Sequence, residues 1–376
     1  MGWCEKGAAG SFGTRFALTS ASVFNRSSCV KTLISLAAVQ AALIASSQAL
    51  IISLNPTPGM DANALSGFQL AANYWQSKLT DNVTVNIDVG FSALAPNVLG
   101  SAGSNSAGFL VADIQNALIA DATTATDALA ISHLPTLSGS GGLSFLTQVN
   151  TEAGSLVVSL DNDNSGNNRV LDINTANAKA LGWTGAVPGA ADASITFSSL
   201  FSWDFDQSNG VGAGLQDFVG VAIHEIGHAL GFVSGVDTVD SAISGIVGEA
   251  PPFNAPFDLE NFRVYSALDL FRYSAPGTLN LAAGSASYFS LDGGTTNLGL
   301  FSTGSTHGDG RQASHWKDNL GLGIMDPTAN PAGQINTPSA LDLKAFDAIG
   351  WNLIPEPSTA LLGFFGAMLA CVRRRR

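Results

Sequence analysis

Two histidines, His224 and His228, stand four residues apart in the chain, with Glu225 between them. Side chains at this spacing share one face of a helix, so both imidazoles would point the same way beside a carboxylate. They would supply two of the three protein ligands that a catalytic zinc ion needs, and a further position would stay open for water. Glu225 is placed to take a proton from that water and to pass it to a leaving amine. The pattern therefore predicts zinc-dependent hydrolysis. The alternative is a buried helix whose histidines are only hydrogen-bonded.

The neighbouring residues indicate that this pattern lies on a helix. Asp217 is a suitable N-cap, and Gly231 is a suitable stop. Between them apolar residues recur at helical spacing, namely Val219, Ala222, Ile223, Ile226, Ala229 and Leu230.

A third zinc ligand must come from elsewhere in the chain. The glycine that ends the helix would let the chain turn a later ligand back to the metal, but Ser234, three residues on, is a poor zinc ligand. His315 is the preferred candidate, and His307 and Asp237 remain as alternatives. We interpret His133 as a structural histidine near a helix end.

His315 lies in a Ser-His-Trp sequence, and a Gly-Ile-Met-Asp-Pro sequence containing Met325 follows it. Together with the HExxHxxGF sequence that begins at His224, this order resembles the leishmanolysin branch of the metzincin zinc metalloproteases. The resemblance covers residues 224–327. It implies that His224, His228 and His315 bind zinc and that Glu225 is the general base. It also implies that Met325 forms a Met-turn under the metal site, for which core packing is the alternative.

The same resemblance implies an α+β catalytic domain at residues 50–354. Its features would be a twisted mixed sheet, an active-site helix and the Met-turn, with an insert at about 236–310. Apolar periodicity predicts helices at 62–79, 109–131 and 341–351 and strands at 83–89 and 193–200. By resemblance the 193–200 strand would be the sheet edge that pairs with substrate backbone. Segments 100–108 and 136–142, rich in Gly and Ser, are expected to be loops.

The two ends of the chain are expected to be targeting signals. Basic residues precede an apolar run at 32–45, and small residues at 47–49 would suit signal peptidase, so residues 1–49 are predicted to be a leader. At the other end, Pro-Glu-Pro at 355–357 precedes an apolar stretch and four arginines. This resembles a PEP-CTERM tail, which an exosortase-type enzyme removes. The terminal segments imply transient membrane contact and export to the surface or extracellular matrix of a Gram-negative bacterium.

The composition of residues 50–354 excludes some partners. This part has 8 basic and 27 acidic residues, a net charge of about −19, which argues against nucleic acid and anionic lipid. The three cysteines fall in the predicted terminal signals, so no disulfide is expected. The expected partner is a protein or peptide substrate.

A second metal site is predicted in an Asp-Asn-Asp-Asn-Ser-Gly sequence. Asp161, Asp163 and Ser165, with Asp172 at the twelfth place, resemble a calcium loop, and a solvated turn is the alternative. For the whole chain, the alternative to an endopeptidase is a surface or matrix protein in which metal has a structural role. The carboxylate of Glu225 argues against this alternative, because a structural zinc site needs no base.

Overall fold

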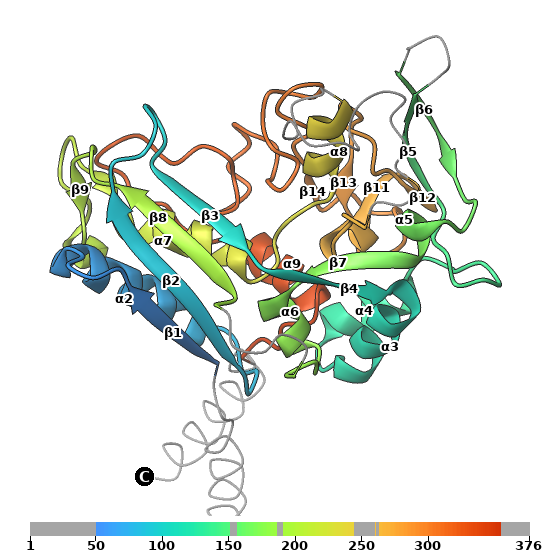
Figure 1. The fold of residues 1–376 in the computed structure, drawn as a ribbon, viewed down its shortest axis with the longest axis horizontal. Coiled ribbons are helices and arrows are strands. Elements are labelled where there is room, and N and C mark those ends of the chain that lie inside the picture. Colours follow the sequence, from blue (N-terminus) through green and yellow to red (C-terminus); the bar gives the residue numbers. More distant parts are fainter. Residues whose placement is uncertain (1–49, 151–155, 186–190, 244–259, 261–262, 355–376) are drawn as a thin grey trace, which may run out of the picture. The chain divides into compact units, whose positions relative to one another are not determined.

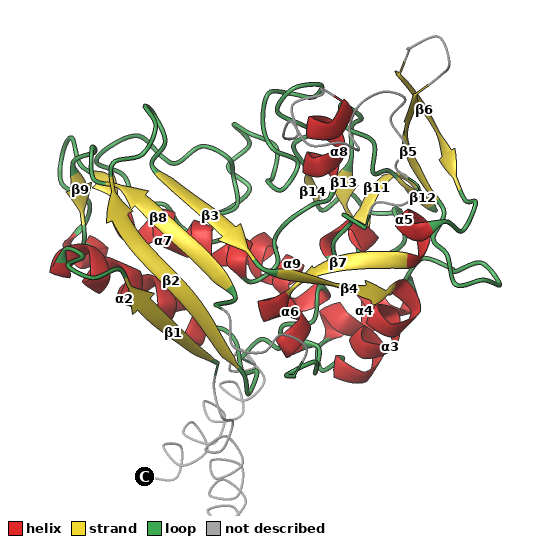
Figure 2. Ribbon diagram, viewed as in Figure 1, coloured by secondary structure: helices red, strands yellow, loops and turns green. Residues whose placement is uncertain are grey.

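The computed structural model describes residues 50–150, 156–185, 191–243, 260 and 263–354. Within them, eight α-helices and several small sheets form a mixed structure of the α+β class (Figure 2). The predicted signals at residues 1–49 and 355–376 lie outside the described residues. Among the residues described, no helix is both long and apolar enough to cross a membrane.

A four-stranded sheet forms one part of the fold (Figure 1). Its strands, in spatial order, are β1 (Ile51–Pro56), β2 (Thr84–Ser92), β8 (Ala193–Ser198) and β3 (Gly100–Ser104). The first three are parallel, and β3 is antiparallel to β8. The alternating valines and isoleucines of β2 predicted this strand, and Val85, Ile87 and Val89 are buried as a half-buried strand requires.

Two helices pack together beside this sheet, and one of them carries the histidine pair. Helix α2 (Ala62–Gln76) begins at Asp61, whose carboxylate accepts hydrogen bonds from two backbone N–H groups of the first turn. It packs on α7 (Phe218–Ala229), and the Trp75 indole donates to the carbonyl of Ile223 at 3.0 Å. The predicted helices at 62–79 and around residue 224 are thus confirmed.

The predicted edge strand is wrong. β8 lies inside the sheet, between β2 and β3, and β3 is the edge. The segment 100–108, expected to be a loop, forms β3 and then β4 (Ser106–Leu110), which Figure 1 shows running on from β3. Its glycines and serines have weak strand propensity, but pairing with β8 and with β7 (Val170–Asn174) supplies the backbone hydrogen bonds. Tertiary pairing therefore overrides local composition.

The helix predicted at 109–131 is divided into two. Phe109 and Leu110 end β4, and the remainder forms α3 (Val111–Asp121) and α4 (Ala125–Ser132). Thr124 and Asp127 form a reciprocal capping box that starts α4, so the chain begins a new helix there. The loop expected at 136–142 is present, and His133 is the C-cap residue of α4.

The remaining elements surround the third candidate ligand or complete the fold. They are β5 (Phe145–Asn150), β6 (Leu156–Asp161), α5 (Gly166–Arg169), α6 (Thr175–Ala180), β9 (Trp203–Asp204), η1 (Gln207–Asn209), β10 (Gln216–Asp217), α8 (Val236–Ile243), η2 (Leu268–Phe271), β11 (Arg272–Ala275), β12 (Thr278–Leu279), β13 (Tyr288–Phe289), β14 (Gly299–Leu300) and α9 (Ala340–Ala348). Strands β12, β11, β13 and β14 form a second four-stranded sheet within the predicted insert. Helix α9 confirms the last predicted helix, and Gly350 follows it with φ +97°.

Candidate metal centre

Helix α7 and the segment around residue 315 bring three imidazoles together. The Nε2 atoms of His224 and His228 lie 3.0 Å apart. The Nε2 atom of His315 lies 3.1 Å from that of His228 and 3.3 Å from that of His224. The three residues form one of two groups among the described residues whose ligand atoms are close enough to hold a metal ion.

The opposite nitrogen of each ring fixes its protonation. Each Nδ1 faces a backbone carbonyl oxygen, in the pairs His224 with Ile324 at 2.6 Å, His228 with Phe232 at 2.7 Å and His315 with Gln312 at 3.2 Å. A carbonyl oxygen only accepts, so Nδ1 must carry the proton. In a neutral ring Nε2 is then a bare lone pair, which is the form that binds a metal.

The donor set fits zinc. Three lone pairs that face one another at 3.0–3.3 Å repel unless a cation lies among them. Two nitrogens bound to one tetrahedral zinc ion at about 2.05 Å would themselves be about 3.3 Å apart. Burial lowers the pKa of His315 to about 3 and holds the pKa of His228 well below its ordinary value, with the charge of neighbouring imidazoles adding to both effects. Both rings are therefore neutral at pH 7.

Local contacts hold α7 in place at both ends. The carboxylate of Asp217 accepts a hydrogen bond from the Gly220 N–H at 3.0 Å, which confirms the predicted N-cap. At the other end Gly231 adopts φ +116°, a conformation that lets the chain reverse directly after the helix. The carbonyl of Phe232 is thereby returned to the Nδ1 atom of His228.

Met325 packs against α7 between the two helical ligands. A Cβ atom at Gly227 would lie 2.7 Å from the Met325 sulfur, so only glycine fits there without a shift. Met325 is fully buried, and the carbonyl of the preceding residue, Ile324, accepts the His224 hydrogen bond. The turn at Met325 therefore orients a candidate ligand as well as filling space.

The segment that carries His315 is held by residues distant in sequence. Asp237 accepts hydrogen bonds from the Ala313 N–H at 2.5 Å and from both the N–H and the hydroxyl of Ser314. The buried guanidinium of Arg272 donates to the carbonyls of Ala313 at 3.1 Å and Ser302 at 2.6 Å. These contacts fix the backbone directly before the third imidazole.

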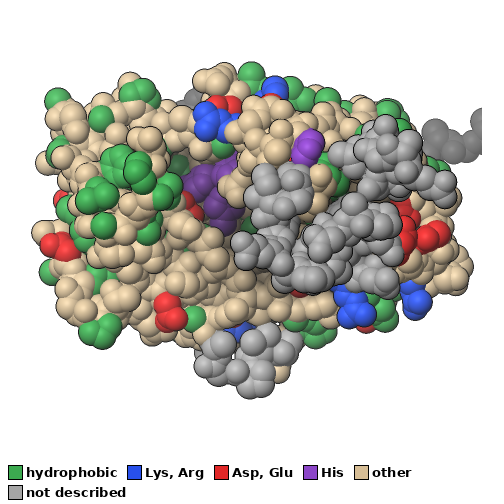
Figure 3. Space-filling view, turned by 45° about the horizontal axis from the view of Figure 1, so that its top comes forward, with side chains coloured by type: hydrophobic (Ala, Val, Ile, Leu, Met, Phe, Trp, Pro, Cys, Tyr) green, Lys and Arg blue, Asp and Glu red, His purple; other side chains and the backbone are tan. Residues whose placement is uncertain are grey.

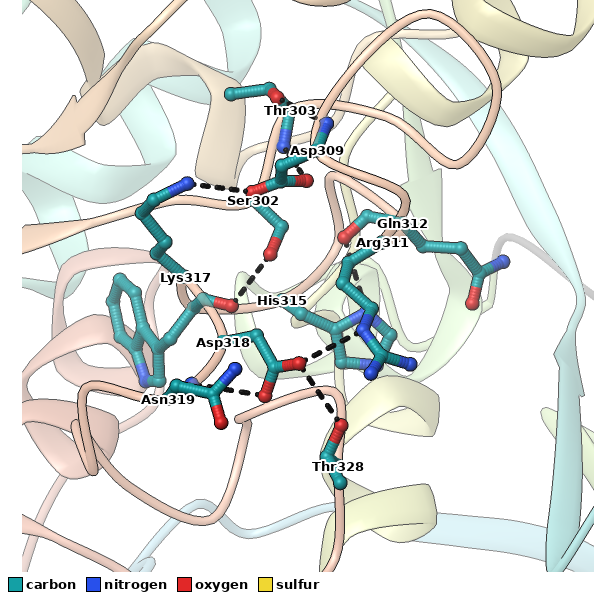
Figure 4. A network of polar contacts seen from close by, with 11 residues as sticks. Ser302, Thr303, Asp309, Arg311, Gln312, His315, Lys317, Asp318, Asn319 and Thr328 are labelled. Atoms are coloured by element: carbon teal, nitrogen blue, oxygen red, sulfur yellow. Dashed lines mark hydrogen bonds and ion pairs between the residues drawn. The ribbon is translucent and has the colours of Figure 1, made fainter.

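A polar network continues on the surface side of this segment (Figure 4). Lys317 pairs with Asp309 at 3.0 Å, and Asp318 pairs with Arg311 at 2.9 Å. The Arg311 and Lys317 side chains are 44% and 40% exposed, so we expect each pair to add little to stability. The buried contacts of Asp237 and Arg272 are the stronger constraint on His315.

Asp342 was not singled out as a site residue in the sequence. It is fully buried in α9, and its carboxylate accepts hydrogen bonds from the indole of Trp316 at 2.8 Å and the N–H of Ile324 at 2.9 Å. It thus joins the residue after His315 to the turn at Met325. Its position three residues after Ser339, as the N3 member of a capping box, was the one available signal.

Glu225 lies next to the histidines at the base of the edge strand. A Cβ atom at Gly100 in β3 would lie 3.3 Å from Glu225 Oε1 and 2.7 Å from the Phe197 ring. A side chain at this position would therefore crowd the carboxylate. Burial raises the pKa of Glu225 above its ordinary value, opposed by the charge of His224.

Two cavities meet at Glu225 and form a cleft. The first, of about 450 Å³, extends past Val221 toward the residues after Met325. The second, of about 500 Å³, contains all three histidines and extends past β3 and β4 to Asp172. Figure 3 shows histidine side chains at the floor of a hollow in the surface. A peptide in the cleft would pass directly over the histidines and Glu225.

The alternative third ligands lie elsewhere. The carboxylate of Asp237 holds the backbone beside His315 and is not part of the histidine group. His307 contacts Asp240, with Nδ1 3.2 Å from Oδ1. The ring of His133 faces its own helix, at the Leu129 carbonyl and the Ser132 hydroxyl, in agreement with its structural interpretation.

The predicted calcium loop has a different set of neighbours. Asp161 and Asp163 group with Glu260, whereas Asp172 lies in β7, opposite Gly108 of β4. Asp172 as the twelfth-place ligand is therefore wrong. The physical reason is that the chain enters α5 at residue 166 and then β7 instead of closing around an ion. The Ser165 hydroxyl donates to an asparagine within α5, and calcium binding here stays a prediction.

Comparisons with known proteins were made at three levels. No protein-family model, no curated protein and no solved structure matches the chain. What the site can do must therefore be inferred from its own geometry and chemistry.

Proposed function

We propose that the protein is a zinc-dependent endopeptidase of the metzincin type, similar to the leishmanolysins, and that it is exported to the cell surface or matrix. The observation that carries the proposal is the convergence of three bare Nε2 atoms beside a buried carboxylate. His224, His228 and His315 would hold the zinc ion. A purely structural site gains nothing from Glu225.

Each protein group has a defined task in this proposal. When bound, zinc supplies a Lewis acid that polarises the peptide carbonyl and acidifies water. Glu225 takes a proton from the attacking water and delivers it to the leaving amine nitrogen. Its raised pKa suits both tasks, since a stronger acid would return the proton less readily. The carbonyls of Ile324 and Phe232 keep His224 and His228 in the metal-binding tautomer.

The edge strand β3 offers a place for the substrate backbone. It is the last strand of its sheet among the described residues, and Gly100, at its start, lines both cavities. An extended peptide that adds to this edge would be held by main-chain hydrogen bonds over Glu225. This assigns to β3 the part that the sequence had suggested for β8.

Two packing features support the metzincin type. Met325 lies against Gly227 between the helical ligands, and Asp342 ties this turn to Trp316, the neighbour of His315. The third ligand is thereby attached to the same turn that orients the first.

The proposal is tested by hydrolysis of casein by the purified, zinc-loaded protein, with zinc counted per chain. We expect the parent to cleave and Glu225→Gln to retain one zinc ion while losing at least about a thousandfold in rate. Asp113→Asn, at an exposed helix position, is the control and should behave as the parent. Zinc binding by the parent without hydrolysis of casein or gelatin would favour a structural metal and contradict the proposal.

A further inference from the structure

Asp172 is a carboxylate in the cleft that the proposed chemistry does not use. It lies in β7 opposite Gly108, whose missing side chain leaves room beside it. Its Oδ2 atom accepts a hydrogen bond from the Ser106 hydroxyl at 2.8 Å, which holds the carboxylate in one orientation. Among the described residues no second hydrogen bond to this carboxylate is recorded.

The cavity that contains the three histidines also contains Asp172. Most of its lining is uncharged and polar, and no lysine or arginine is among the described residues that line it. Asp172 and Glu225 are its two carboxylates, and Glu225 is committed to proton transfer in the proposed reaction. Burial raises the pKa of Asp172, so its charged form lacks a compensating cation within the protein.

The strand that leads to Asp172 fixes where a substrate would meet it. β3 and β4 run on from one another, and Gly100, Ser104 and Ser106 all line the cavity. A peptide antiparallel to this edge would run from Ser106 toward Gly100. Its N-terminal part would therefore pass Asp172 before the backbone reaches Glu225.

We propose that Asp172 is a specificity-determining residue that binds a lysine or arginine side chain of the substrate, N-terminal to the cleaved bond. The inference rests on the proposed function and names its substrate class as peptides with a basic residue. A charge-assisted hydrogen bond in a partly desolvated cavity distinguishes a guanidinium from a neutral group of the same shape. The negative charge of residues 50–354 would also attract basic peptides.

Arg263 is the internal competitor for Asp172. Its δ-carbon lies 3.9 Å from the position of a Cβ at Gly108, the residue opposite Asp172. The ion pairs recorded among the described residues do not include these two side chains. The inference therefore requires that removal of Arg263 leaves the preference for basic peptides at least as large.

The test measures peptide binding to the zinc-loaded Glu225→Gln protein by fluorescence anisotropy. The probes are labelled Ala-Ser peptides with one arginine at successive positions, each paired with its citrulline counterpart, which has nearly the same shape but no charge. At one position we expect the arginine peptide to bind about tenfold more tightly than the citrulline peptide. The difference should shrink at high salt.

Three further substitutions identify the residue responsible. Asp172→Asn should abolish the arginine preference and leave the melting temperature near the parent value. Asp88→Asn should keep the preference, because Asp88 is also a strand aspartate with one side-chain partner, Asn55, but is exposed and outside the cleft. Arg263→Ala should keep or increase it.

The outcomes separate this inference from the proposed function. An equal affinity for arginine and citrulline peptides at every position, a preference that survives Asp172→Asn, or one that appears only in Arg263→Ala would overturn it. Cleavage of the same peptides by the protein with Glu225 intact is measured in parallel. Selective binding without cleavage would overturn the peptidase proposal and leave the role of Asp172 standing, whereas cleavage without selectivity would do the reverse.

Discussion

The two sides of the histidine group are built in different ways. On one side, α7 presents His224, Glu225 and His228 through its own periodicity, with a cap at Asp217 and a glycine at its end. On the other side, His315 lies outside the helices and strands. Side chains far away in sequence hold its backbone, chiefly Asp237, Arg272 and Asp342.

This difference has a consequence for stability and for metal binding. A helix keeps its spacing as long as it is packed, so its two ligands need little further support. An irregular segment must be held by specific hydrogen bonds, and the loss of one partner leaves a buried polar group unsatisfied. Substitutions on the His315 side should therefore affect metal affinity more than those on the α7 side.

The largest effect should follow the loss of the buried arginine. Burial lowers the pKa of Arg272 to about 10, so it remains a cation at neutral pH, balanced by Asp269 and Asp237. Arg272→Met would leave these carboxylates without that charge and two carbonyls without donors. We expect a loss of about 3 kcal/mol in the free energy of unfolding. Urea unfolding measures it.

The matched control for this prediction is Arg311→Met. Arg311 is 44% exposed and pairs with Asp318 in the same segment. The control should cost less than about 1 kcal/mol. Equal losses for the two arginines would show that the buried network does not hold the segment.

Asp237→Asn should weaken zinc binding without touching a ligand. It removes an acceptor from the N–H and hydroxyl groups next to His315. Outer partners of this kind are typically worth about 10- to 100-fold in metal affinity, which competition with a coloured chelator measures. Asp318→Asn, on the surface side of the segment, should leave the affinity unchanged. An unchanged affinity in Asp237→Asn would contradict the contrast between the two sides.

On the α7 side, Gly227→Ala should have a smaller effect. The new methyl group would press on the Met325 sulfur, a contact that typically costs about 1–3 kcal/mol, while alanine regains about 1 kcal/mol of helix propensity. We expect a net loss of about 1 kcal/mol in thermal unfolding. Combination with Met325→Ala tests the cause, because the second change should make the first one favourable. Additive losses would exclude this contact as the reason for the glycine.

Asp347, in α9, gives the smallest effect and a test by pH. Burial raises its pKa from 3.8 to about 6, and its Oδ1 atom lacks a hydrogen-bond partner among the described residues. The folded protein holds this proton better, so the stabilising contribution is complete below pH 3.8 and is lost as pH rises through 6. Asp347→Asn should therefore raise the melting temperature slightly at pH 8, by less than about 1 kcal/mol, and not at pH 4. Zinc affinity should not change. A gain of equal size at both pH values would contradict this explanation.

The same contrast explains what could be predicted from the sequence. The α7 ligands and helix α2 follow from side-chain spacing and capping residues, which act locally. The strands β3 and β4 were missed because glycine and serine become strand residues only through pairing with β8 and β7. Asp237 was correctly placed near the site but as the wrong kind of group, because a sequence does not tell a ligand from a carboxylate that holds the ligand's backbone. Asp342 and Gly100 matter through contacts with distant residues.

The most direct test of the account is zinc K-edge X-ray absorption on the zinc-loaded protein, measured beside His315→Ala and His307→Ala. The account predicts three imidazole ligands in the parent and in His307→Ala. It predicts two imidazoles, or no bound zinc, in His315→Ala. Three imidazoles in His315→Ala, or the loss of one in His307→Ala, would contradict it.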